Sequence, residues 1–288
     1  MALLYLLLSI IFSTLINLIF RWFKDYNVNK FQAIMVNYLV CFIVGFSLSG
    51  DRALIEHLES DWFPYCILLG FLFVAIFFSM ALTTEKMGIS VTAVSGKMSV
   101  VIPILFAYIF WNENISIWFI VGLILSLLSI YFISIKKDLN LDRKYLLLPL
   151  IVFIGGGIID TSLKILESSY GQSVSMDTIS YSIFLGAFIA GIILFVIRKK
   201  GDFTLFTSKS LAAGVILGVP NYFSIFFLLT AIASFSGKSA FVFGINNIGV
   251  VLFSTILSIL LFGEKLSKGN KLGILLAIIS ISIIAYAS

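Results

Sequence analysis

The chain has 288 residues, of which 60% are hydrophobic and 15% aromatic, while 11% carry a charge and the net charge is +5. An ordinary soluble domain has about 25% charged residues, and a mean hydropathy of +1.13 is typical of a chain whose solvent is lipid. A soluble globular domain is therefore excluded. The lack of alternating polar and apolar positions also excludes an outer-membrane β-barrel.

Ten apolar segments are each long enough to cross the hydrocarbon core as a helix, which takes about 20 residues. The first has no charged leader region and no small-residue cleavage site after it, so we expect a retained helix and not a signal peptide. The sequence therefore predicts an all-α polytopic membrane protein. Its expected spans are 2–20, 31–49, 62–82, 89–110, 115–135, 145–166, 177–197, 210–231, 238–262 and 268–287.

The connections between the spans differ in charge. Most of the 19 Lys and Arg residues follow the odd-numbered spans, whereas the opposite set of connections holds only Arg52 and Lys238. Short cytoplasmic loops carry an excess of Lys and Arg, so we expect both termini to lie on the outer side of the cytoplasmic membrane. Positive charge at span ends, and not on a soluble face, excludes nucleic acid as a partner. The lipid bilayer is the expected surroundings.

The two halves of the chain share small and polar residues in one register. A shift of 151 residues pairs Glu113 with Glu264, Ser116 with Ser267, Gly122 with Gly273 and Ser129 with Ser280. Five spans per half is an odd number, so the second half is inverted relative to the first. We therefore predict ten transmembrane helices in two inverted five-helix repeats, over residues 1–140 and 141–288, which form one membrane unit.

Tight turns of an aromatic residue, a small residue and a glutamate close the fourth and ninth spans. They read Trp111-Asn112-Glu113 and Phe262-Gly263-Glu264. In these turns and in its ten spans, the chain resembles the EamA branch of the drug/metabolite transporter superfamily over essentially its whole length. The resemblance implies a basket of helices in which spans one, three, four, six, eight and nine line a central cavity. Many members of the superfamily have both termini in the cytoplasm, whereas the charges here predict the opposite.

The candidate site begins with three charged residues inside expected spans, Lys97, Asp160 and Lys164. Lys97 lies in the fourth span between Gly96 and Pro103, where a charge costs at least about 2.5–3.5 kcal/mol and is expected to face a cavity or a partner. Asp160 and Lys164 are four residues apart in the sixth span, which would pair them on one helix face. A purely structural ion pair is the alternative. Together the three carry one positive charge, which predicts a cavity that favours an anionic group such as a carboxylate.

Neutral polar residues complete the candidate site. Asn221 and Tyr222 follow Pro220 in the eighth span, and Asn246 and Asn247 fall beside Lys97 under the shift of 151. Such residues also hold neighbouring helices together, which is the alternative for each. The predicted substrate-binding residues are Lys97, Asp160, Lys164, Asn221, Tyr222, Asn246 and Asn247.

Glu113 and Glu264 invite a proton-relay interpretation, but both lie at turns between spans. A carboxylate at such a turn accepts hydrogen bonds from the free N–H groups of a helix start and complements the helix dipole. We therefore expect each glutamate to cap the helix that follows it.

The sequence favours a carrier over an enzyme. The single histidine, His57, lies in a loop; Cys41 and Cys66 have no partner at metal-ligand spacing; and there is no Walker motif for ATP. No catalytic residue, metal or cofactor is predicted. We expect a secondary transporter that moves a small metabolite, an amino acid or organic acid, by alternating access, as a monomer or homodimer, with the proton as candidate coupling ion. The alternative is an exporter of hydrophobic drugs or lipid-linked sugars with the same fold, and an intramembrane enzyme ranks behind both.

Overall fold

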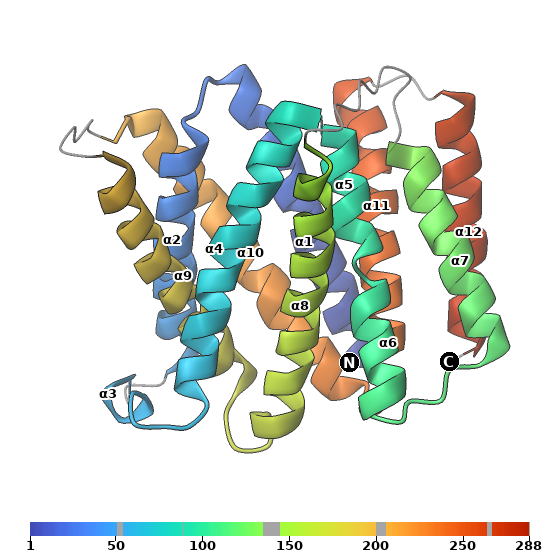
Figure 1. Cartoon of the computed structure of the whole chain (residues 1–288), viewed down its shortest axis with the longest axis horizontal. Coiled ribbons are helices and arrows are strands. Elements are labelled where there is room, and N and C mark those ends of the chain that lie inside the picture. The colour runs from blue at the N-terminus through green and yellow to red at the C-terminus, as the bar shows by residue number, and fades with distance from the viewer. Residues whose placement is uncertain (51–53, 88, 135–144, 200–205, 264–266, 288) are drawn as a thin grey trace.

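The computed structural model describes residues 1–50, 54–87, 89–134, 145–199, 206–263 and 267–287. Its long helices run up and down through one bundle, and both termini lie at the same end of it, called here the terminal end (Figure 1). The helices are α1 (Ala2–Asp25), α2 (Lys30–Ser49), α3 (Leu54–His57), α4 (Phe63–Met87), α5 (Ile89–Met98), α6 (Val101–Phe110), α7 (Ile117–Ser134), α8 (Leu147–Tyr170), α9 (Met176–Lys199), α10 (Ser208–Ser234), α11 (Ser239–Phe262) and α12 (Lys268–Ala287).

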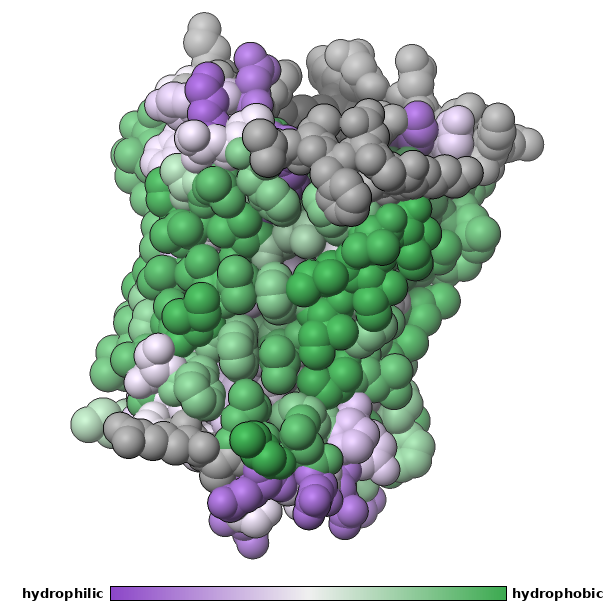
Figure 2. Space-filling view, turned by 90° about the vertical axis from the view of Figure 1, so that its left-hand side faces the viewer, coloured by the Kyte–Doolittle hydropathy of each residue, from purple (hydrophilic) through white to green (hydrophobic). Residues whose placement is uncertain are grey.

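The bundle has the surface of a membrane protein. Within the described ranges, nine helical segments are long and apolar enough to span a bilayer, and the apolar helix over Ile117–Ile133 is shorter. Figure 2 shows a broad hydrophobic belt between two ends where hydrophilic residues gather. Large apolar side chains such as Leu68 and Leu260 are well over half exposed on the protein alone, because lipid covers them. The chain is therefore a multi-pass membrane protein. Nine of the ten expected spans overlap these segments, and the expected span 115–135 overlaps the shorter helix.

Several helices begin and end at residues suited to these positions. The Asn29 side chain accepts hydrogen bonds from two backbone N–H groups at the start of α2, at 3.1 and 3.3 Å. Thr207 accepts one from the Ser210 N–H at 3.2 Å at the start of α10. Gly50 and Gly263 end α2 and α11 with φ of 64° and 62°, a left-handed conformation that glycine adopts without strain.

The fourth expected span is broken into α5 and α6. Pro103 has no N–H, so it cannot donate to the carbonyl of Ser99 four residues earlier. The Ile102 N–H bonds to that carbonyl instead, at 2.9 Å, which is the tighter spacing of a turn. The Ser99 Oγ in turn donates to the carbonyl of Gly96 at 2.7 Å. The expected bend beside Lys97 is thus an interruption of the helix.

Helices α7 and α12 pack side by side at one edge of the bundle (Figure 1) through two matching contacts. The Ser129 Oγ on α7 donates to the carbonyl of Gly273 on α12, and the Ser280 Oγ on α12 donates to the carbonyl of Gly122 on α7, each at 2.8 Å. The serines are 151 residues apart in the sequence, and so are the glycines. Each serine therefore contacts the glycine that corresponds, under the shift of 151, to the glycine on its own helix.

The remaining helices of the two halves interleave. Helix α1 packs against α10 and α11, while α8 packs against α4, α5 and α6, and α2 and α4 both contact α9. The proposed boundary between the halves, at residue 140, lies outside the described residues.

Gly70 sets the distance between α4 and α9. A Cβ added there would lie 2.3 Å from the carbonyl oxygen of Ile183 and 2.4 Å from the backbone N of Ala187. Because backbone cannot yield as a flexible side chain can, we expect Gly70→Ala to lower the free energy of unfolding by about 1–3 kcal/mol through overpacking. Thermal unfolding of the detergent-purified protein measures the loss. Gly191→Ala is the matched control, since its nearest neighbour would be the Met35 side chain at 3.6 Å; equal melting temperatures for the two variants would contradict this packing.

Candidate substrate site

Lys97 and Asp160 come together from two helices near the middle of the bundle. They lie on α5 and α8, which pack against each other, so that each charge acts on the other, and both side chains remain partly exposed. The helices approach closely here because Gly156 on α8 has no side chain; a Cβ at this position would lie 2.9 Å from the Ser99 Oγ. The ammonium group thus has a carboxylate on the neighbouring helix, as a charge inside a membrane requires.

Lys164 does not form the predicted pair with Asp160. Its Nζ bonds instead to the Glu167 Oε2 at 2.6 Å, and it lies 6.0 Å from the centroid of the Trp111 ring. Lys164 is 6% exposed. The prediction of the i,i+4 pair was wrong because Glu167, three residues on, is an equally accessible partner on a helix, and because Lys97 supplies the cation near Asp160.

Sequence reasoning missed Glu167 as a member of this group. The signal was available, since Asp160, Lys164 and Glu167 are spaced i, i+4, i+7 and therefore share one face of α8. With Lys97, they form what we call the charged stripe, which holds two ammonium groups and two carboxylates. With Glu167 included its formal charge is zero, in place of the one positive charge of Lys97, Asp160 and Lys164.

Asn246 and Asn247 lie on α11 and are both buried. The Asn246 Oδ1 accepts a hydrogen bond from the Ser9 Oγ on α1 at 3.1 Å, and that hydroxyl lies equally close to the carbonyl of Ser224 on α10. The Asn247 Nδ2 donates to the carbonyl of Phe243, one turn earlier, at 3.2 Å. The two Ser9 bonds hold α1, α10 and α11 together, as the helix-contact alternative expects for Asn246, whereas the Asn247 bond lies within α11.

Asn221 and Tyr222 belong to a different part of the bundle core. The Asn221 Nδ2 on α10 donates to the Asn37 Oδ1 on α2 at 3.1 Å. Tyr222 is 1% exposed and lies in an aromatic cluster with Tyr38 and Phe184. Among the described residues, no hydrogen bond joins Asn221 or Tyr222 to the charged stripe.

Glu113 caps a helix, but not the one that follows it. Its Oε1 accepts hydrogen bonds from the N–H and the Oγ of Ser239, at 2.8 and 2.5 Å, and its Oε2 accepts one from the N–H of Ala240 at 2.9 Å. All three donors belong to the first two residues of α11, far away in the sequence. The start of α7 is capped instead by the Ser116 Oγ, which accepts from the Phe119 N–H at 3.2 Å. Glu264 lies outside the described residues.

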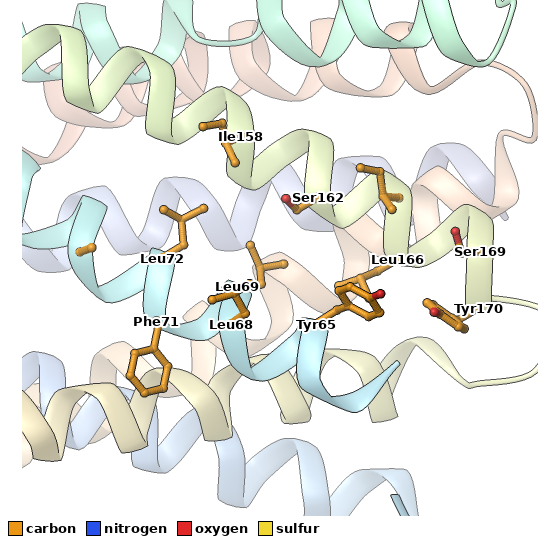
Figure 3. A pocket seen from close by; sticks show the side chains of 12 residues that line it. Tyr65, Leu68, Leu69, Phe71, Leu72, Ile158, Ser162, Leu166, Ser169 and Tyr170 are labelled. Carbon is orange, nitrogen blue, oxygen red and sulfur yellow. The ribbon is translucent and has the colours of Figure 1, made fainter. Parts of the chain in front are cut away.

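A separate groove of about 770 Å³ lies between α4 and α8, lined mostly by apolar side chains. In Figure 3, Tyr65 and Tyr170 stand at one end and Leu72 and Ile158 at the other. Each helical residue turns the chain by about 100°, so the α8 residues of the groove, such as Ile158 and Ser169, lie on the opposite face from Asp160. The charged stripe therefore does not line this groove.

Comparison with known proteins gives the family. Residues 1–135, which include the turn Trp111-Asn112-Glu113, match the EamA-like transporter family. The chain is 30% identical over 289 residues to an uncharacterized protein of Haemophilus influenzae, and the match covers 98% of this chain and 97% of that protein. A solved crystal structure of a protein has the same fold, with a TM-score of 0.81 at 13% identity over 99% of this chain and 97% of that one. The chain belongs to the EamA-like transporter family of the drug/metabolite transporter superfamily and is a membrane transporter.

Proposed function

We propose that this transporter moves a small metabolite, an amino acid or a related organic acid, across the cytoplasmic membrane by alternating access. The observation that carries the proposal is the Lys97–Asp160 pair, which lies deep in the bundle yet remains partly exposed. Charges inside a membrane span are costly and generally serve transport or a substrate. A pair that is not sealed from solvent is suited to contact a charged solute.

The charged stripe supports a substrate that carries charges of both signs. Lys97 would contact the carboxylate of the substrate, and Asp160 would contact an ammonium group. Because the stripe has as many carboxylates as ammonium groups, a zwitterion leaves its electrostatic balance unchanged. Asn246 and Asn247 would supply hydrogen bonds from α11, whereas Asn221 and Tyr222, in a different part of the bundle core, would hold α10 against α2.

Alternating access is supported by a difference between two seams that correspond under the inverted repeats. Spans one and eight are helices α1 and α10, which pack together along one seam. Their counterparts in the other repeat, spans six and three, are helices α8 and α4, which pack along the second seam. The α4–α8 seam carries the groove, which starts at the end of α8 nearest the terminal end. The opposite half of the α1–α10 seam is closed by Ile19, Phe23, Ala213 and Leu217. Exchange of these two arrangements is the motion that inverted repeats permit.

An uptake screen in proteoliposomes tests the proposal. The purified protein would be offered amino acids and organic acids one at a time, with and without an imposed pH gradient. We expect uptake of at least one of them above that of protein-free vesicles, and a response to the gradient if protons are coupled. No uptake of any member of the set would overturn the proposal.

One observation favours the second candidate, an exporter of hydrophobic or lipid-linked compounds. The α4–α8 groove is apolar, and Leu68 and Tyr65 on its α4 side are more than half exposed on the lipid-facing surface. A hydrophobic solute could enter such a groove from the bilayer. Uptake of hydrophobic cations, and not of acids, in the same screen would support this candidate.

The orientation we propose places both termini outside the cytoplasm. The connections rich in Lys and Arg follow the odd-numbered spans and so lie on the side of the membrane opposite to the termini, which is the cytoplasmic side by the positive-inside rule. We expect alkaline phosphatase fused after Ser288 to be active and green fluorescent protein at the same place to be dark. Fusions after Lys137 should give the opposite pair of signals. A fluorescent C-terminal fusion would contradict the orientation.

A further inference from the structure

Glu113 is a buried carboxylate in a turn near the terminal end of the bundle. It is 5% exposed, and its three hydrogen bonds, at 2.5–2.9 Å, all come from the first two residues of α11. Hydrogen bonds to a charged group are short and strong, and the positive end of the α11 dipole adds to them. The turn that carries Glu113 is therefore anchored to α11.

The turn is also held at its other side, on α6. The N–H groups of Trp111 and Glu113 both lie 3.2 Å from the carbonyl oxygen of Ala107. Asn112, between them, has a φ of 49°, which an asparagine tolerates better than most residues. With Ala107 at one side and α11 at the other, the conformation of the turn has little freedom.

Trp111, in the same turn, contacts Lys164 of the charged stripe. Its ring lies 6.0 Å from the Lys164 Nζ, which is within the range of a cation–π contact. Lys164 lies on α8 and bonds to Glu167. One turn of the first half therefore contacts two helices of the second half, α11 through Glu113 and α8 through Trp111.

We propose that Glu113 is a positioning residue for transport. By anchoring its turn to α11, it holds the Trp111 ring against Lys164 and so sets the place of this ammonium group in the charged stripe. A carboxylate that only capped α11 would affect stability and leave the surroundings of Lys164 unchanged. The transport part of this inference rests on the proposed function, whereas the placement of Trp111 does not.

The placement is tested first by fluorescence. In a variant with Trp22, Trp62 and Trp118 replaced by phenylalanine, Trp111 is the only fluorophore of its kind. Glu113→Gln puts an NH2 group against the N–H donors of α11, so we expect a new fast component in the anisotropy decay of Trp111. Glu59→Gln is the matched control, because it makes the same change at an exposed carboxylate and should leave the decay as it was.

The effect on transport is tested with the substrate found in the uptake screen. Glu113→Gln is expected to raise KM about tenfold with Vmax within about twofold, the size expected when a desolvated cation–π contact is lost. Glu113→Asp, which keeps the charge, should recover part of the loss. A rise in KM together with a mobile Trp111 supports the inference.

An unchanged anisotropy decay in Glu113→Gln would overturn the inference, and so would a variant that loses only thermal stability. If Glu113→Gln does not fold, Ser239→Ala takes its place, because it removes one of the three donors and should free Trp111 to a smaller extent. If the screen finds no substrate, the proposed function fails, and the fluorescence experiment still decides whether Glu113 places Trp111.

Discussion

Lys97→Met is expected to reduce substrate uptake by about 100-fold, because removing one partner of a charge pair formed on binding costs about 2–5 kcal/mol and each 1.4 kcal/mol is a factor of ten. Methionine keeps the length and apolar character of the lysine stem but removes the ammonium group. The substrate carboxylate then has no cation to replace its hydration, and Asp160 loses the charge near it. Initial uptake rates into proteoliposomes, normalised to the inserted protein, measure the effect.

The control for this experiment is Lys209→Met, which makes the same substitution at an exposed position near the start of α10. It should leave uptake at the parent rate. Lys97→Arg keeps the charge on a wider group and should keep part of the activity. If Lys97→Met transports every accepted acid at the parent rate, the lysine has no role in substrate binding.

Asp160→Asn is expected to destabilise the protein by about 3–5 kcal/mol, since it leaves the Lys97 ammonium without its carboxylate in a low-dielectric interior. The double variant Lys97→Met/Asp160→Asn removes both charges and should be more stable than either single variant. The coupling energy of such a cycle isolates the interaction between the two residues. Denaturant unfolding of the four proteins in detergent micelles measures it.

Glu167→Gln provides the comparison, because it removes the partner of Lys164 from the same face of α8. Glu167 is 13% and Lys164 8% exposed at the side chain, and Lys97 and Asp160 are also partly exposed, so a loss of similar size is expected for the two pairs. Additive losses in the Lys97/Asp160 cycle would mean that the two charges do not interact, contrary to the structure.

The helices could be predicted from the sequence because a membrane span is a long apolar run with a simple physical cause. Pro103 indicated a bend in the fourth span, and the structure breaks the helix four residues earlier, where the carbonyl of Ser99 loses its normal donor. The register of 151 pairs the two serines and the two glycines that make the contacts between α7 and α12, although it did not predict that these helices pack together. These features depend on local chemistry and on composition.

The site was harder to predict because its contacts join residues that are distant in the chain. The lysine and the aspartate of the central pair were both identified, but their proximity depends on how closely α5 and α8 pack at Gly156. Glu113 was expected to cap its nearest helix, yet it caps α11 through Ser239, 126 residues away. Local spacing identifies a capping carboxylate but does not say which helix start folds onto it.

Labelling of a cysteine at position 97 tests most directly whether this ammonium group lies where solvent and substrate reach it. In a variant without the buried Cys41 and Cys66, Lys97→Cys would be exposed to a membrane-impermeant methanethiosulfonate, with Leu275→Cys on the lipid-facing side of α12 as control. We predict that position 97 reacts much faster than position 275. A cysteine at 97 that reacts no faster than the one at 275 would contradict the account.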